Sequence, residues 1–132
     1  MKVLIADPDW HFARKATSFL ESHAHLVVCE NRPTAVLAQA AGWQPDLVIL
    51  SAELAQRGLI ESLTTMSPRP AILLTEHMAR FDRAWRVWQK GGDELLLKPV
   101  FTVDELHQAI VTARENAVTG RRRQPVTAAA SA

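Results

Sequence analysis

The sequence predicts an α/β fold in which a parallel sheet is covered by helices on both faces. Short apolar runs recur along the chain, and each is too short for a helix and lacks polar alternation, as in strands buried on both faces. These runs alternate with segments whose apolar residues recur every three or four positions, which is the spacing of amphipathic helices. The 132 residues fit one domain, and an apolar fraction of 48% is enough for a hydrophobic core.

Five apolar runs are the predicted strands. The clearest lies between Asp46 and Ser51 and consists of four consecutive apolar residues after a Pro-Asp turn. The other strands, in chain order, are residues 2–6, 26–29, 71–74 and 95–97. Because strands and helices alternate within one domain, we expect right-handed crossovers and a parallel sheet.

Helical spacing and helix-end signals bound five predicted helices. Asp9 is placed to cap the first helix, residues 10–23, and Pro33 or Thr34 opens the second, which ends near Gly42. The third is a short helix around residues 59–63, and the fourth covers residues 80–90. The last begins with a capping box at residues 102–105 and ends at about residue 116. Its inward residues are expected to be Val103, Leu106, Ile110 and Ala113.

Polar residues follow four of the strands. They are Asp7 after the first, Ser51 after the third, Thr75 after the fourth and Lys98 after the fifth. In a doubly wound sheet with the strand order 2-1-3-4-5, these strand ends meet at the topological switch point, where ligands bind. The four residues are therefore the candidate functional site.

Four segments, VLIAD, PDLVILS, AILLT and GGDELLLKP, resemble in this order the receiver domains of two-component response regulators. The resemblance covers residues 1–116 and implies a flavodoxin-like fold with five strands in the order 2-1-3-4-5 and five helices. It also implies that the candidate site corresponds to the family's phosphoacceptor pocket, and that the Lys98–Pro99 peptide bond is cis.

Two residues of the pocket depart from the family's pattern. Ser51 stands where the family has the aspartate that accepts a phosphoryl group, and a serine hydroxyl needs an adjacent base that these loops lack, since they contain no histidine. Pro8 stands where the family has a second acid that binds Mg²⁺, and it has no side-chain oxygen. Asp9 is expected to cap a helix instead, which leaves Glu53 as the one acid that could replace part of the lost charge.

These departures predict a degenerate pocket in which Asp7 pairs with Lys98 and Mg²⁺ binding is weak or lost. We expect no catalytic residue, no other metal site and no cofactor. The family's conformational relay also lacks its aromatic residue, because the switch position is Leu95, although Thr75 is present.

The leading hypothesis is a pseudo-receiver that acts as a phosphorylation-independent protein-interaction module in phosphorelay-type signal transduction, and not as an enzyme. One alternative is a receiver that is phosphorylated at a non-standard residue, Ser51 or Glu53. The other is a small-molecule-binding domain of flavodoxin type, although the loop after the first strand lacks the hydroxyl- or glycine-rich sequence that holds a phosphate.

A partner surface is predicted on the fourth and fifth helices, which the family uses for partners and dimers. Phe81, Ala84, Trp85 and Trp88 would face inward, and Arg80, Arg83, Arg86 and Lys90 outward. The fifth helix begins with Asp104 and Glu105, so that a basic helix lies beside an acidic one. Such a face is complementary to itself in a two-fold dimer and could equally bind another signalling protein. The competing interpretation is an ordinary pair of solvated helices.

Composition narrows the remaining function classes. No apolar run reaches the roughly 20 residues of a membrane span, and the single Cys29, which excludes an internal disulfide, fits a reducing cytoplasm. The net charge is only +1, and three of the 15 basic residues stand together at Arg121, Arg122 and Arg123, which argues against specific nucleic-acid binding. Residues 117–132 are expected to form a disordered basic and alanine-rich tail.

Overall fold

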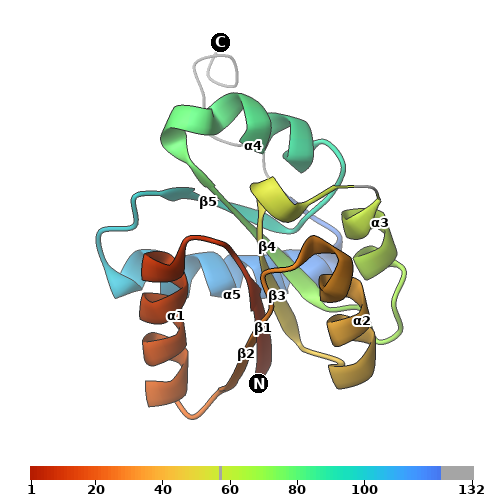
Figure 1. Cartoon of the computed structure of the whole chain (residues 1–132), viewed down its shortest axis with the longest axis horizontal. Coiled ribbons are helices and arrows are strands. Elements are labelled where there is room, and N and C mark those ends of the chain that lie inside the picture. The colour runs from red at the N-terminus through yellow and green to blue at the C-terminus, as the bar shows by residue number, and fades with distance from the viewer. Residues whose placement is uncertain (57, 123–132) are drawn as a thin grey trace.

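A five-stranded parallel sheet forms the centre of the computed structural model, which describes residues 1–56 and 58–122 (Figure 1). The strand order is β2-β1-β3-β4-β5, as predicted. The strands are β1 Lys2–Ala6, β2 Leu26–Cys29, β3 Leu47–Ser51, β4 Ala71–His77 and β5 Glu94–Lys98. The predicted flavodoxin-like α/β architecture is therefore confirmed.

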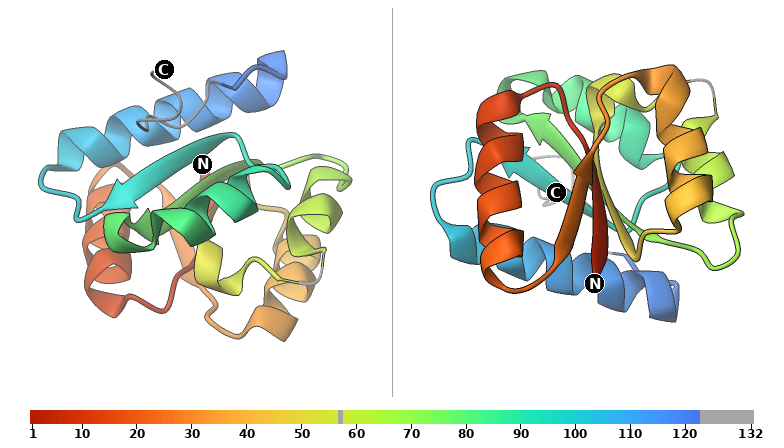
Figure 2. Two further views of the ribbon diagram at one scale, coloured as in Figure 1. Left: turned by 90° about the horizontal axis from the view of Figure 1, so that it is seen from above. Right: turned by 60° about the horizontal axis from the view of Figure 1, so that its bottom comes forward.

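Helices cover both faces of the sheet (Figure 2). They are α1 Trp10–Ser22, α2 Pro33–Trp43, α3 Leu59–Thr64, α4 Phe81–Trp88 and α5 Val103–Thr119. Helices α1 and α5 pack on one face, and α2, α3 and α4 pack on the other. Two short 3-10 turns, η1 Ala52–Leu54 and η2 Met78–Arg80, follow β3 and β4.

The sheet has a hydrophobic core on each side because successive strand residues point to opposite faces. In β1, Val3 and Ile5 belong to the core under α1 and α5, whereas Leu4 and Ala6 belong to the core under α2, α3 and α4. All five residues of β3 are buried. This two-sided burial explains why the central strands are continuous apolar runs.

Side-chain caps begin the two helices beside the candidate site. The Asp9 carboxylate accepts a hydrogen bond from the Phe12 amide (3.2 Å) at the start of α1. At the start of α5, the Thr102 hydroxyl accepts from the Glu105 amide (3.3 Å). In a capping box the Glu105 carboxylate would accept a hydrogen bond from the amide of the cap residue, Thr102. Here it accepts from the amide of the preceding residue, Phe101 (3.4 Å).

Several predicted boundaries differ from the structure. Strand β4 continues to His77, and α4 begins at Phe81 after the η2 turn and ends at Trp88. Val103 is 57% exposed, so its predicted inward position is wrong, and the first residue of α5 that is buried is Leu106.

The predicted boundary at residue 116 is also wrong, because α5 continues to Thr119. The Asn116 amide donates to the Asp93 carbonyl oxygen (2.8 Å), and Ala117 packs against the core under α1 and α5. Gly120, with φ of 71°, then ends the helix in the left-handed conformation. The rest of the predicted tail, residues 123–132, lies outside the described residues.

Two peptide bonds before proline are cis, the expected Lys98–Pro99 bond and the Ser67–Pro68 bond. Among residues 1–56 and 58–122, none of the helices combines the length and the apolar character that a membrane span requires.

Candidate functional site

Four strand ends bring Asp7, Ser51, Thr75 and Lys98 together, and all four residues are buried. Strand register places Ser51 directly beside Thr75. The residues two positions earlier in the chain, such as Ile5, Ile49 and Leu73, point to the same face of the sheet and belong to the core under α1 and α5. The four polar side chains therefore extend this face of the sheet at its carboxyl edge.

Asp7 is the centre of the site. Its Oδ2 atom lies 2.7 Å from the Lys98 ammonium and accepts a hydrogen bond from the Thr75 hydroxyl (2.8 Å). Its Oδ1 atom accepts from the Asp9 amide (2.9 Å). Both oxygens of this buried carboxylate are thus engaged by groups of the chain itself, and the predicted pair with Lys98 is present.

Asp9 does more than cap α1. Its Oδ2 atom lies 3.3 Å from the Lys98 ammonium and 3.5 Å from His77 Nε2, while Oδ1 accepts from the Phe12 amide. Burial raises the pKa of Asp9, but the Phe12 hydrogen bond and the positive charge of Lys98 outweigh this effect and lower it below its ordinary value. Two carboxylates therefore face one lysine, although Asp9 was expected only to cap the helix.

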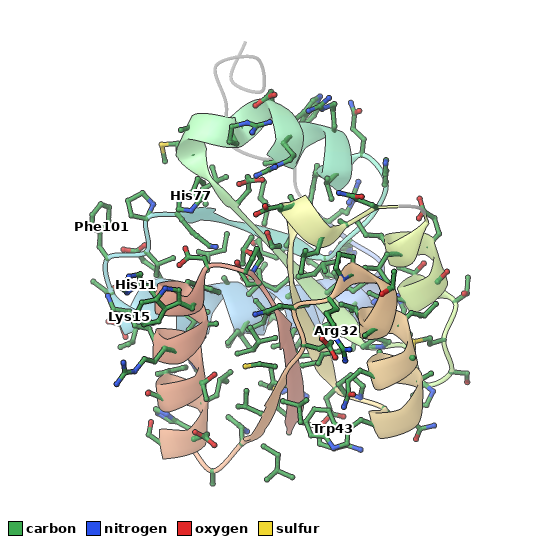
Figure 3. The ribbon with its side chains drawn as sticks, viewed as in Figure 1. His11, Lys15, Arg32, Trp43, His77 and Phe101 are labelled. Carbon is green, nitrogen blue, oxygen red and sulfur yellow. The ribbon has the colours of Figure 1, made fainter. Side chains whose placement is uncertain are left out.

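His77 corrects the expectation that no histidine lies near the pocket. It lies two positions after Thr75 on β4, and the longer strand brings its ring to the Asp9 carboxylate. Figure 3 shows His77 on the same side of the molecule as His11 and Phe101. A strand period of two, applied beyond the predicted end at Thr75, would have indicated this position.

Ser51 is a structural cap in this arrangement. Its side chain is only 4% exposed, and its hydroxyl oxygen accepts a hydrogen bond from the Glu53 amide (3.2 Å) at the start of the η1 turn. Within residues 1–56 and 58–122, the Ser51 hydroxyl has no hydrogen bond to a histidine or a carboxylate that could remove its proton.

The two loop residues beside Asp7 and Ser51, which are Pro8 and Glu53, are both exposed. Pro8 is exposed on the β1–α1 loop, and it has no side-chain oxygen. Glu53 is exposed, and among the described contacts its carboxylate makes no hydrogen bond to Asp7, Ser51 or Lys98.

The residues around Asp7 do not fit Mg²⁺. This ion requires several oxygen ligands in near-octahedral positions. Both oxygens of Asp7 already accept hydrogen bonds, and the Ser51 oxygen accepts one from a backbone amide. Within residues 1–56 and 58–122, no group of three or more His, Cys, Asp or Glu residues is placed to hold a metal ion.

Arg83 is not part of an outward basic face, as the helical spacing predicted. Its guanidinium forms a two-pronged ion pair with Glu76 of β4, and one of the contacts, from Nη2 to Oε1, is 3.2 Å. The Glu76 side chain is 2% exposed. The signal in the sequence is Glu76 itself, an acid two positions after the apolar run of β4, because a buried carboxylate needs a cationic partner.

The other predicted interface residues lie at the surface. Arg86, Lys90, Asp104 and Glu105 are all exposed, and Arg86 pairs with Asp82 within α4 (3.6 Å). Leu95, at the predicted switch position on β5, is partly buried and packs against the core under α2, α3 and α4. It therefore adds to this core, and as a leucine it has no aromatic ring.

The sequence matches no protein-family model and no curated protein. Solved structures, in contrast, are similar along nearly the whole chain. NtrX from Brucella abortus, solved in complex with ADP, has a TM-score of 0.76 at 18% identity over 98% of this chain. The match covers 32% of the NtrX chain, so this chain spans about a third of that protein.

Two further structures cover more of their own chains. A response regulator receiver domain protein from Clostridium thermocellum has a TM-score of 0.70 at 22% identity, over 91% of this chain and 98% of its own. A protein described as belonging to a family of redox sensors in the streptococci, evolved from two-component response regulators, has a TM-score of 0.70 at 16% identity. That match covers 96% of this chain and 56% of the streptococcal one. At these identities the similarity establishes the fold, which is that of the receiver domains of two-component response regulators.

Proposed function

We propose that this chain is a pseudo-receiver that binds a signalling partner without being phosphorylated. The observation that carries the proposal is the occupation of both Asp7 oxygens by Lys98, Thr75 and the Asp9 amide. A receiver pocket must offer carboxylate oxygens to a metal ion and a nucleophile to a phosphoryl group. This pocket offers a serine that caps a turn and a carboxylate whose two oxygens already accept hydrogen bonds from three groups of the chain.

The proposal includes weak or absent Mg²⁺ binding and no enzymatic activity. Lys98 is neutralised by two carboxylates, so it has little free charge with which to attract a phosphoryl group. The streptococcal redox sensors, which evolved from response regulators, are an example of the fold serving a different kind of signal. We expect this chain to act in the cytoplasm, on a protein partner or on a second copy, without membrane or specific nucleic-acid binding.

The test is a phosphorylation assay followed by intact-mass spectrometry. The protein is incubated with acetyl phosphate and Mg²⁺, and we expect no phosphoprotein from the wild type or from Ser51→Asp, because Pro8 still removes a metal ligand. Ser51→Asp with Pro8→Asp should regain measurable Mg²⁺ affinity by titration calorimetry. Stoichiometric phosphorylation of the wild type would contradict the proposal.

Small-molecule binding is a second candidate, and one cavity favours it. A groove of about 850 Å³ lies between α1 and the β5–α5 loop, within the size range of ligand sites. Its lining includes Phe12, Phe19 and Leu106, with Lys15 and His77 among its polar residues. Figure 3 shows Lys15 and Phe101, which also lines the groove, on the same side of the molecule. Phosphorylation at Ser51, in contrast, has no support from its geometry, because the hydroxyl is buried.

A further inference from the structure

Helix α4 is fastened to β4 at its first turn. The contact is the ion pair between Arg83 and the buried Glu76, whose Oε1 also accepts a hydrogen bond from the His77 amide (2.8 Å). Burial raises the pKa of Glu76, but the hydrogen bonds from Arg83 and His77 outweigh this effect and lower it. Loss of one partner from such a pair leaves the other charge buried without compensation. The position of α4 over the sheet is therefore tied to this contact.

The end of α4 is fastened by a different part of the chain. Trp88, which is 3% exposed, is covered by Arg122, whose guanidinium carbon lies 4.1 Å from the centroid of the Trp88 ring. Arg122 also donates a hydrogen bond from Nη1 to the Gly92 carbonyl oxygen (3.1 Å). Arg122 follows the Gly120 cap of α5, so residues 120–122 form a strap from the end of α5 to the end of α4.

The Gly92 end of this strap is firmly anchored. A Cβ atom on Gly92 would lie 2.8 Å from Leu74 Cδ1, so the turn packs directly against β4. The next residue, Asp93, accepts hydrogen bonds from both Nη atoms of Arg69 (2.9 Å each) and from the Ile72 amide (2.8 Å). Arg122 thus bridges a turn that packs against the sheet and the tryptophan at the end of α4.

We propose that residues 120–122 are a coupling strap that links the position of α4 to the end of α5. Arg83 and Trp88 lie five positions apart in a helix of only eight residues. The Arg83–Glu76 ion pair and the Arg122–Trp88 contact therefore fix the two ends of the same short helix. A partner that displaces α4 removes the Trp88 face from Arg122 and releases the strap. Conversely, removal of the strap loosens α4, since the coupling is reciprocal. This inference concerns the chain's own contacts and is independent of whether the pocket accepts a phosphoryl group.

The first experiment removes the strap and measures α4. Amide hydrogen exchange is recorded by NMR on the full chain for Arg122→Ala and for Arg121→Ala, a matched control that removes the same charge one residue earlier. We expect exchange in residues 84–88 to rise about two- to fivefold in Arg122→Ala, as the loss of a cation–π contact implies, and not in Arg121→Ala. Unchanged exchange in Arg122→Ala, or an equal rise in both variants, would overturn the proposal.

The second experiment loosens α4 and measures the strap. The Trp88 ring current should shift the side-chain proton resonances of Arg122, and this shift reports the contact directly. We expect the shift to decrease in Arg83→Met and to persist in Arg86→Met, which removes a surface arginine from the same helix. Arg83→Lys, which keeps the charge but loses the two-pronged geometry, provides the same measurement if Arg83→Met does not fold. A ring-current shift that persists in every folded Arg83 variant would show that the two ends of α4 are uncoupled.

Discussion

A single carboxylate, Asp7, holds the candidate site in one arrangement. It accepts hydrogen bonds from three groups, and two of these, Thr75 and Lys98, come from other strands. A buried ion pair with further hydrogen bonds offsets much of its desolvation cost, whereas a single buried charge does not. The pocket is therefore stable as it stands, and it becomes unstable when one partner is removed.

Removal of one partner should show this dependence. Lys98→Met leaves the Asp7 carboxylate buried without its cation, and we expect the free energy of unfolding to fall by about 1–3 kcal/mol. Asp7→Asn should also destabilise, and the double variant should recover part of the combined loss. Urea unfolding of the four proteins gives the coupling energy. Purely additive effects would mean that the two side chains do not interact in solution.

Glu76 gives a prediction for pH. Burial raises its pKa, but hydrogen bonds from Arg83 and the His77 amide outweigh this and hold it below its ordinary value of 4.5. A carboxyl group with a lowered pKa in the folded state stabilises the fold above its unfolded-state pKa, and this contribution disappears as pH falls through the folded-state pKa. The stability difference between wild type and Glu76→Gln, measured by urea unfolding, should thus be nearly constant between pH 7 and pH 5 and shrink as the pH is lowered from 5 to 3.5. A difference that is constant over this range would contradict the prediction.

Among the elements, the strands were predicted well and the ends of the helices less well. Buried parallel strands are continuous apolar runs, so β1 and β3 could be located from composition alone. The extension of β4 could not be located from apolar composition, because Glu76 and His77 are polar and their partners, Arg83 and Asp9, lie on other elements. Only the strand period of two, continued past Thr75, indicates it. The last turn of α5 could not be located either, because Asn116 is polar and its partner, the Asp93 carbonyl oxygen, lies outside the helix.

The start of α1 allows the two roles of Asp9 to be separated. Asp9→Asn keeps a side-chain oxygen that can cap the helix and removes only the charge beside Lys98, whereas Asp9→Ala removes both. We expect Asp9→Ala to be less stable than Asp9→Asn by about 1 kcal/mol, which is the usual value of an N-cap. Urea unfolding near neutral pH measures the difference. Equal stabilities would mean that the Phe12 contact contributes nothing.

At the scale of the whole molecule, the receiver fold places a serine, Ser51, at the carboxyl end of β3. The positions of Asp7, Ser51, Thr75 and Lys98 followed from strand order, because parallel strands bring their carboxyl ends to one edge. The hydrogen bonds that Asp7 accepts from Thr75 and the Asp9 amide could not be predicted, since they depend on the packing between strands and loop. The face of α4 was mispredicted at Arg83 because helical spacing alone does not reveal a buried partner.

Without Arg83, the exposed charges of α4 and α5 still predict a charge-dependent assembly. Arg80, Arg86 and Lys90 are exposed on or beside α4, and Asp104 and Glu105 are exposed at the start of α5. A two-fold contact would place the basic set of one copy against the acidic set of the other. Each exposed pair contributes only about 0–1 kcal/mol, so we expect a dimer that is weak and sensitive to salt.

Sedimentation velocity at high micromolar protein concentration tests this assembly. The wild type should dimerise at low ionic strength and dissociate as salt is added, and Arg86→Glu with Lys90→Glu should remain monomeric, because acidic side chains would then oppose the acidic start of α5. Arg14→Glu with Lys15→Glu changes the charge equally on α1, which is exposed at both positions, and should leave the dimer intact. If the α1 variant dissociates equally, net charge and not this face controls association. A wild type that stays monomeric at low salt would exclude the homodimer and leave a different protein as the partner for α4 and α5.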